Sequence, residues 1–378
     1  MSNIVFYITI PVTEMSMKEK ITLQHIANEL GITKGTVYRA IHHRPDISPI
    51  TREKVLKLIE KYNYTPDKVA RSLSLKSKKI RIGAIYQSES KFFWDNIVNG
   101  IRTAEAELSD FGLEIIHKKL NDEREASTTL QAINDCINEK VDAIALVPAN
   151  DITIKEKIDQ AFEMGIPVAT LNDDIVDSKR IFYVGPQVRQ SGRIAGELMG
   201  EFLNRKGKVF TINLDVASLE YRERFEGFNE IISENYKGVD IIANYNYNYK
   251  KAGKKGISIL KGILENMDEI DGIYCVDGGM LYNVASIIKS IDKLEKVTLI
   301  GHEIWSKVKE LIADGTIRAC ISQDPFSQGY FVIKLLFDFL IEKRRPEFER
   351  MFTRLDIIMK ENLINQNNVV NPYFISTT

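Results

Sequence analysis

The stretch ITLQHIANELGITKGTVYRAI, residues 21–41, decides the fold of the N-terminal part of the chain. Its first apolar residues recur at helical spacing on one face: Leu23, Ile26, Ala27 and Leu30. Gly31 then ends that helix, and Thr33 is a good N-cap for a second helix over residues 34–42. The second helix again places its apolar residues on one face: Val37, Ala40 and Ile41. The pattern predicts two short helices joined by a tight turn.

A third helix follows the first two. Ser48 suits its N-cap and Pro49 its first helical position. Its apolar face consists of Val55, Leu58, Ile59 and Tyr62. Three helices of this size form a small bundle, so we expect a helical head over residues 18–66.

Charge separates this head from the rest of the chain. Residues 18–81 contain 15 Lys and Arg against 6 Asp and Glu, and the remainder contains 36 against 46, although the whole chain has a net charge of −1. Such a basic segment suits a polyanion, although a charge run can also be a solvated face. A helix, a short turn and a second helix with a polar exposed face form the helix-turn-helix motif. In this motif the second helix enters the DNA major groove. Charge and geometry together favour double-stranded DNA as partner.

Several head residues are candidates for DNA contact. Arg39 offers a fork suited to guanine or to phosphate, and Thr22, Thr33 and Thr36 can bond phosphates at helix ends. The remaining candidates are Lys34, Gly35, Tyr38 and His42, on or near the exposed side of the second helix, and Leu23 of the first helix.

From Arg81 onward, β-branched runs alternate with amphipathic helices such as residues 95–108 and 188–203. The predicted strands are residues 82–86, 113–117, 143–148, 167–171, 208–214, 239–245, 272–276, 297–300 and 317–321. Alternating strands and helices form doubly wound parallel sheets, and this many strands predict two lobes. Such lobes bind ligands in the cleft between them, at the carboxyl ends of their strands.

Five ordered blocks resemble the lactose repressor (LacI/GalR) family: ITLQHIA (21–27), GITKGTVYRAI (31–41), TREKV (51–55), YNYTP (62–66) and VARSL (69–73). The resemblance implies a cytoplasmic bacterial homodimer that binds a pseudo-palindromic operator and is controlled by a small effector. It also implies a hinge helix or linker over residues 67–79, in which Leu73 enters the minor groove. Lys68 and Arg71 give Leu73 a cationic setting, as minor-groove wedges require. The alternative is a linker leucine that packs on its own domain.

The chain departs from the family where DNA sequence would be read. Members usually carry Ser before the arginine and Asn a few residues later, where this chain has Tyr38 and His42. Gly35, at a base-reading position, has no side chain. We therefore expect readout by Lys34, Tyr38 and Arg39, and an operator that cannot be copied from relatives.

The remainder of the chain resembles the sugar-binding lobes that these repressors share with periplasmic sugar receptors. The effector positions carried over are Phe93, Trp94, Asn172, Asp174, Arg224, Asp277, Glu303 and Gln323. Planar polar side chains suit vicinal hydroxyls, and aromatic faces suit a sugar ring. The acidic Asp277 and Glu303 favour a neutral polyol over a phosphorylated or carboxylated ligand. The resemblance thus implies a sugar or cyclitol. Phe93 and Trp94 have core packing as an alternative, Asn172 a turn, and Asp277 a helix N-cap.

The expected organisation is a leader over residues 1–17, disordered or spurious, followed by the head, the hinge and two lobes. The first lobe comprises residues 80–185 and 325–352, and the second residues 186–322 and 354–378.

No glycine fingerprint for nucleotides, zinc-protease motif or nucleophile elbow occurs, so neither an enzyme nor a cofactor is expected. Cys136, Cys275 and Cys320 have no metal-binding spacing and are expected as reduced core thiols. A transport receptor, the main rival, would need a secretion signal and no basic head. The sequence also lacks a membrane span and a tetramerisation zipper.

Overall fold

The computed structural model describes residues 21, 23–41, 47–62, 79–88, 91–121, 125–214, 218–267, 269–291 and 297–363. The chain divides into two compact units, residues 1–77 and 78–378, and each is described by itself. Several predictions lie outside the described residues: the leader, most of the hinge, the segment 364–378, and the DNA-contact candidates Thr22, His42, Lys68, Arg71 and Leu73.

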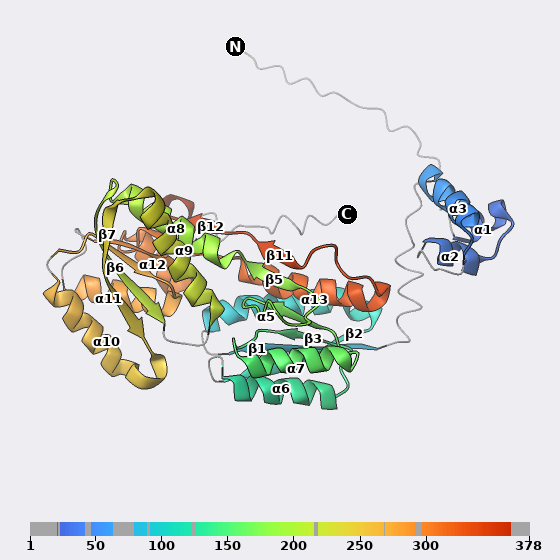
Figure 1. Cartoon of the computed structure of the whole chain (residues 1–378), viewed down its shortest axis with the longest axis horizontal. Coiled ribbons are helices and arrows are strands. Elements are labelled where there is room, and N and C mark those ends of the chain that lie inside the picture. The colour runs from blue at the N-terminus through green and yellow to red at the C-terminus, as the bar shows by residue number, and fades with distance from the viewer. Residues whose placement is uncertain are drawn as a thin grey trace, which may run out of the picture. The chain divides into compact units, whose positions relative to one another are not determined.

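The first unit is the predicted helical head (Figure 1). Helices α1 (Leu23–Leu30), α2 (Lys34–Ile41) and α3 (Pro49–Lys61) surround a small core of Ile26, Ala27, Val37, Ala40, Ile47 and Val55. Gly31 takes a φ of +62° between the first two helices, a conformation that glycine adopts without steric cost. The predicted caps are confirmed, because Thr33 accepts from the Thr36 amide at 3.1 Å and Ser48 from the Thr51 amide at 3.1 Å.

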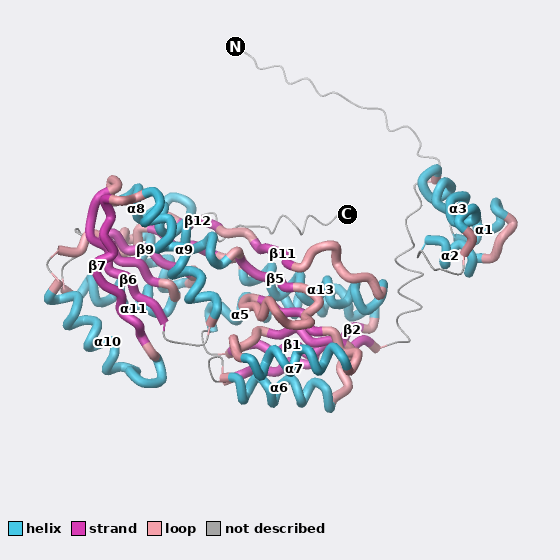
Figure 2. Tube along the Cα trace, in the orientation of Figure 1, coloured by secondary structure: helices cyan, strands magenta, loops and turns pink. Residues whose placement is uncertain are grey.

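The second unit contains two six-stranded sheets (Figure 2). The first has the order β11-β5-β4-β3-β1-β2 and is parallel throughout. Its strands are β1 (Ile80–Gln87), β2 (Leu113–Leu120), β3 (Ala143–Leu146), β4 (Val168–Leu171), β5 (Tyr183–Pro186) and β11 (Arg350–Thr353). Helices α5 (Lys91–Leu108) and α13 (Pro325–Glu342) pack together on one face, and α6 (Ala126–Asn138) and α7 (Ile152–Glu163) lie on the other (Figure 1).

The second sheet has the order β12-β10-β9-β8-β6-β7. Its strands are β6 (Lys206–Leu214), β7 (Gly238–Tyr247), β8 (Gly272–Cys275), β9 (Thr298–His302), β10 (Ala319–Ser322) and β12 (Asp356–Ile358), of which only β12 pairs antiparallel. One face carries α8 (Val188–Phe202) and α9 (Leu219–Asn235). The remaining helices of this lobe contact one another in chain order: α10 (Tyr249–Asn266), α11 (Gly278–Ser290) and α12 (Ser306–Ala313).

Three described crossovers join the lobes: β5 to α8, β10 to α13, and β11 to β12. All nine predicted strands are confirmed, whereas β5, β11 and β12 were missed. These three strands have three or four residues each, and their sequences YVGP, RMFT and DII offer no long apolar run. The helix predicted from Asp95 begins earlier, at Lys91, so Phe93 and Trp94 lie in its first turns.

Candidate functional site

Arg224 is the most deeply buried charged side chain of the second unit's interlobe region, with 1% of its surface exposed. It lies on α9, whose backbone approaches α8 closely because α8 carries glycine at the contact. A Cβ atom on Gly192 would lie 2.0 Å from the Arg224 carbonyl oxygen, and one on Gly227 would lie 2.1 Å from the Arg189 carbonyl oxygen. Arg224 and Gly227, three residues apart on α9, therefore combine a buried polar side chain with a packing glycine.

The Arg224 guanidinium joins three segments of the second lobe. It donates to the Val276 carbonyl oxygen at 2.8 Å, to Glu303 Oε1 at 2.7 Å and to Glu220 Oε1 at 2.7 Å. Glu220 was missed by the sequence analysis, although its position one turn before Arg224 on α9 was an available signal. Two carboxylates thus share one guanidinium in a buried setting.

Hydrogen bonds extend this cluster into the first lobe. Gln323 Nε2 donates to Glu303 Oε1 at 2.8 Å and to Glu220 Oε1 at 3.1 Å. Gln328 Nε2 donates to the Gln323 carbonyl oxygen at 3.0 Å, and Asn172 Nδ2 donates to Gln328 Oε1 at 3.3 Å. Gln328 is a second residue that the sequence analysis missed. A buried polar chain therefore runs from the end of β4 in one lobe to α9 in the other.

Burial perturbs the titration of this cluster. It raises the pKa of Glu303, an effect that Arg224 opposes and Glu220 reinforces. Burial also acts to lower the pKa of Arg224, but the charges of Glu220 and Glu303 outweigh it, so the guanidinium stays protonated. His302, adjacent to Glu303 in sequence, has its pKa held well below the usual 6.5 by burial and by the charge of Arg224. Strong perturbation of several neighbouring groups is typical of binding and catalytic sites.

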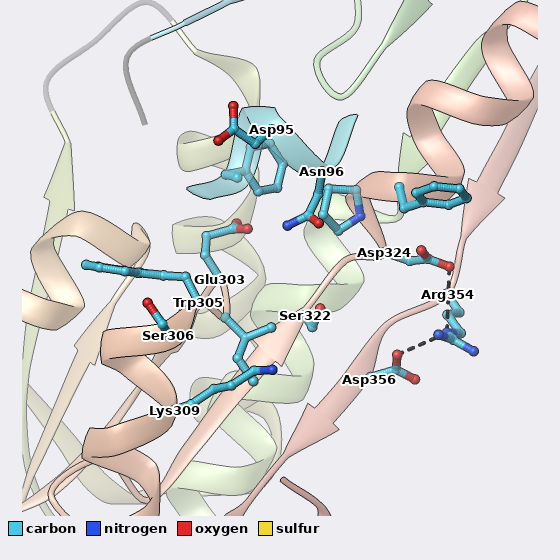
Figure 3. Close-up of a pocket in the computed structure, with 14 residues that line it drawn as sticks. Asp95, Asn96, Glu303, Trp305, Ser306, Lys309, Ser322, Asp324, Arg354 and Asp356 are labelled. Atoms are coloured by element: carbon cyan, nitrogen blue, oxygen red, sulfur yellow. Dashed lines mark ion pairs between the residues drawn. The ribbon is translucent and has the colours of Figure 1, made fainter. Parts of the chain in front are cut away.

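A cavity of about 720 Å³ lies against this cluster, between the lobes (Figure 3). The first lobe contributes Phe93, Asp95 and Asn96 from α5, together with Pro325 and Phe326 from the start of α13. The second lobe contributes Glu303, Ile304, Trp305, Ser306, Lys309, Ser322 and Asp356. The segment between β10 and α13 adds Asp324, and the segment between β11 and β12 adds Arg354. Phe93 and Glu303 are the two predicted effector residues that line this cavity.

Two further predicted residues line a different cavity of about 410 Å³, beside the crossover from β5 to α8. Asn172 has a φ of +65°, is fully buried and leaves its Oδ1 atom without a partner. Asp174 forms a buried ion pair with Arg180, at 2.7 Å between Oδ2 and the guanidinium. Asp174 is therefore committed to a neighbour within its own lobe.

For Trp94 and Asp277 the structure places the side chains in the alternative roles. Trp94 is 7% exposed, packs in the core of the first lobe and does not line the interlobe cavity. Asp277 caps α11, because its Oδ1 accepts from the Met280 amide at 2.9 Å, and it also accepts from the Tyr221 hydroxyl at 3.4 Å. Trp305, which the sequence analysis missed, is the tryptophan that lines the cavity.

In the head, α2 presents Lys34, Gly35 and Arg39 to solvent, with Thr33 exposed just before them. Arg39 bonds within its own helix, to the Gly35 carbonyl oxygen at 3.2 Å and to Thr36 Oγ1 at 3.3 Å. Leu23 is half-buried and packs against the head core. The side chain of Tyr38 lies outside the described part of the chain. The exposed polar face that a recognition helix requires is therefore present.

Two other classes of feature were sought among the described residues. No group of three or more His, Cys, Asp or Glu side chains there is placed to hold a metal ion. No described helix has the length and apolar character needed to cross a membrane. The three cysteines are buried and form no disulfide, and burial raises the pKa of Cys136 to about 12.

Comparison with known proteins identifies the class. Residues 82–344 match the family described as periplasmic binding protein domain, and residues 22–67 match bacterial regulatory proteins, lacI family. The chain therefore belongs to the lacI family of bacterial regulators, a family of non-enzymatic DNA-binding proteins, and carries a periplasmic-binding-protein-like, sugar-binding type of effector domain.

Individual relatives agree with this assignment. Catabolite control protein A of Priestia megaterium is 23% identical over 254 residues, covering 67% of this chain and 73% of the relative. A putative LacI transcriptional regulator from Bacteroides fragilis superimposes with a TM-score of 0.67 at 20% identity, covering 76% of this chain and 99% of that one. A transporter solute-binding protein from Bacillus halodurans with bound myo-inositol gives a TM-score of 0.68 at 18% identity, covering 77% and 98%.

Proposed function

We propose that this regulator is a repressor of sugar or cyclitol utilisation genes that binds a pseudo-palindromic operator as a homodimer inside a bacterial cell. A small polyhydroxyl effector in the cleft between the lobes controls its operator affinity. The observation that carries this proposal is the buried chain of planar polar side chains from Arg224 to Asn172. Such groups have the geometry to bond vicinal hydroxyls, and they connect the two lobes.

The proposed mechanism follows from the bonds of that chain. Gln323 and Gln328 lie at the crossover between β10 and α13, where one lobe passes into the other. An effector that bonds to Arg224, Glu303, Gln323 or Asn172 replaces hydrogen bonds within the polar chain by hydrogen bonds to itself. This replacement changes the preferred angle between the lobes. In the dimer, that angle sets the spacing of the hinge segments, so effector and operator binding are linked reciprocally. The related protein with bound myo-inositol supports the inclusion of cyclitols.

On the DNA side, we propose that Lys34, Tyr38 and Arg39 read the major groove and that Thr22, Thr33 and Thr36 position the head on phosphates. This contact is bordered by His42, Gly35 and Leu23. In the hinge, the basic residues Lys68 and Arg71 hold Leu73 at the minor groove. Asp174, Asp277 and Trp94 remain proposed as contributors to the effector site, through the neighbours that they position.

The test measures binding of the full chain to DNA upstream of its own and neighbouring genes over a range of salt concentrations. Specific binding that weakens steeply with salt supports the regulator, and its absence contradicts it. Light scattering should give the mass of a dimer. Leu73→Ala should abolish specific binding and spare non-specific binding, because the kink at the operator needs an apolar wedge. Equal loss of both would reject that role. Titration with sugars and cyclitols then measures the effector's influence on operator affinity.

A further inference from the structure

Glu303 uses one carboxylate oxygen for the polar chain and turns the other toward the cavity. Arg224 and Gln323 both donate to Oε1, at 2.7 Å and 2.8 Å. Among the described residues none donates to Oε2, and Glu303 lines the cavity with 14% of its side chain exposed. In Figure 3 the carboxylate points toward the end of the cavity that holds Asp95 and Asn96 of the first lobe. Glu303 therefore presents an open acceptor to a ligand.

The charges that line the cavity are unevenly distributed. Four carboxylates line it, on Asp95, Glu303, Asp324 and Asp356, against the two cations Lys309 and Arg354. Arg354 lies between two of those carboxylates, 3.0 Å from Asp356 and 3.7 Å from Asp324. Figure 3 places Glu303 and Asp95 at one end of the cavity, and both cations well away from them. Carboxylates therefore predominate at that end, where Glu303 is 14% exposed and Asp95 is exposed.

The buried side of Glu303 carries charges of both signs. Its guanidinium partner is shared with Glu220, which is 3% exposed, and the nearby Asp277 also acts on Glu303. Two carboxylates thus share one guanidinium, the charge of Asp277 acts on Glu303 as well, and burial raises the pKa of Glu303. Buried carboxylates are costly unless they are paired, so a positively charged ligand group here would relieve that cost.

The aromatic lining of this cavity also suits a cationic sugar, and some buried polar atoms outside the lining have no partner. Phe93, Trp305 and Phe326 line the cavity, and aromatic faces attract cations as well as the C–H surface of a sugar ring. Gln87, at the carboxyl end of β1, is 1% exposed, and neither polar atom of its amide has a partner. The buried Nε atom of Arg224 and the Oδ1 atom of Asn172 also have none. Buried polar atoms are nearly always bonded, so these atoms indicate missing polar contacts in the effector unit, although none of the three residues lines this cavity and Asn172 lines the one of about 410 Å³.

We propose that the effector is a polyhydroxylated amine, an amino sugar or aminocyclitol, whose ammonium group binds Glu303 and Asp95 beside Phe93. Its hydroxyl groups bond the amides and the remaining acceptors of the polar chain. This inference rests on the proposed function, since it names the chemical class of the effector in the same cleft. It separates the effector from neutral sugars, which would leave Glu303 with only the guanidinium that it shares with Glu220.

The test uses matched sugars that differ in charge at one carbon. Glucosamine, galactosamine and mannosamine are compared with the parent hexoses and with the neutral N-acetyl forms, and an inosamine with inositol. Thermal shift of the full chain gives binding, and tryptophan fluorescence provides a second readout, because Trp305 lines the cavity while Trp94 lies in a core. At least one amine should bind on the order of tenfold more tightly than its parent, as expected for a charge-assisted hydrogen bond.

The outcomes distinguish this inference from the proposed function. A parent sugar or cyclitol that binds as tightly as its amine, or more tightly, overturns the ammonium site and leaves the polyhydroxyl effector intact. Failure of every amine and every parent to bind overturns both, while operator binding by the head stays a separate measurement. Preference for an anionic sugar would also overturn the inference.

Variants assign the effect to the two carboxylates. Asp95→Asn changes an exposed residue of α5 and should remove about tenfold of the amine's affinity while leaving binding of the parent sugar unchanged. Glu303→Gln keeps a side chain that can bond Arg224, and it should weaken binding of the amine more than binding of the parent sugar. Asp240→Asn, at an exposed position of β7, is the matched control and should change neither affinity. Equal losses for amine and parent in Asp95→Asn would contradict the ammonium contact.

Discussion

Arg224 and Glu303 are 79 residues apart in sequence, yet the guanidinium nitrogen of one lies 2.7 Å from the carboxylate of the other. The pair joins α9 to the carboxyl end of β9 and continues through Gln323 to the first lobe. Because both side chains are held by other groups as well, the contact has a defined geometry before any ligand arrives. Such preorganisation reduces the entropy that a ligand must lose on binding.

Replacement of Arg224 by Ala should destabilise the effector unit strongly. The substitution leaves Glu220 and Glu303 buried without their guanidinium, a change that costs about 3–5 kcal/mol in comparable pairs. Arg222→Ala is the control, because Arg222 is exposed on the same helix. Chemical denaturation measures the stability, and thermal shift with the effector should show no stabilisation for Arg224→Ala. An Arg224→Ala protein as stable as Arg222→Ala would contradict the network.

Gly192→Ala should displace α8 from α9 and thereby move Arg224. The new Cβ would lie 2.0 Å from the Arg224 carbonyl oxygen, and overpacking of this kind costs about 1–3 kcal/mol. Gly262→Ala on α10 is the matched control, since its Cβ would meet nothing within 4 Å. Removing a glycine from that helix should stabilise the protein by about 0.5–1 kcal/mol. Similar melting temperatures for the two variants would argue against close helix contact at Gly192.

His302 should make the effector unit less stable as the pH falls. Its pKa lies well below 6.5 in the folded protein and near 6.5 in the unfolded chain, so the unfolded state takes up the proton first. The free energy of unfolding is therefore unaffected by the protonation of His302 above pH 6.5. Below pH 6.5 it falls by about 1.4 kcal/mol per pH unit, until the pH reaches the depressed pKa of His302. The measurement is the difference in unfolding free energy between the native protein and His302→Gln, taken at pH values from about 8 to about 5. This range brackets the titration of histidine.

That difference isolates one histidine. Burial also lowers the pKa of His117, which therefore acts in the same direction in both proteins and cancels. A difference that stays constant across the whole pH range would show that His302 titrates normally in the folded state.

Arg39→Ala should weaken operator binding and relax base preference at one position. An arginine that bonds a guanine edge contributes about 1–3 kcal/mol of discrimination. Lys57→Ala on α3 is the control, because that lysine is exposed and pairs with Glu53 at 2.8 Å within its own helix. Binding to a library of operator variants measures both affinity and preference. Uniform weakening across all sequences would place Arg39 on a phosphate instead.

The head could be predicted closely because its signals are local. Helical spacing of Ile26, Ala27 and Val37, the caps Thr33 and Ser48, and the turn at Gly31 all act within a few residues. Nine strands could likewise be predicted, because their apolar runs are local signals. The short edge strands β11 and β12 were not, because their pairing depends on neighbours that are distant in sequence.

The residues of the candidate site could likewise be predicted only in part from the sequence. Sequence reasoning found Arg224, Glu303, Gln323 and Asn172, which the polar chain brings together. It missed Glu220, Gln328 and Trp305, whose roles depend on how the helices and strand ends meet. It also could not decide between sugar stacking and core packing for Trp94, which the structure places in a core.

The basic head with its exposed Lys34 and Arg39 was therefore determined by the sequence alone, because helix periodicity, capping and net charge are local or additive properties. Tertiary structure decided which side chains share the interlobe cavity and that Glu220 and Glu303 divide one guanidinium between them. The physical reason is that contacts across lobes and the cost of burying charge depend on three-dimensional packing, which residue spacing does not encode.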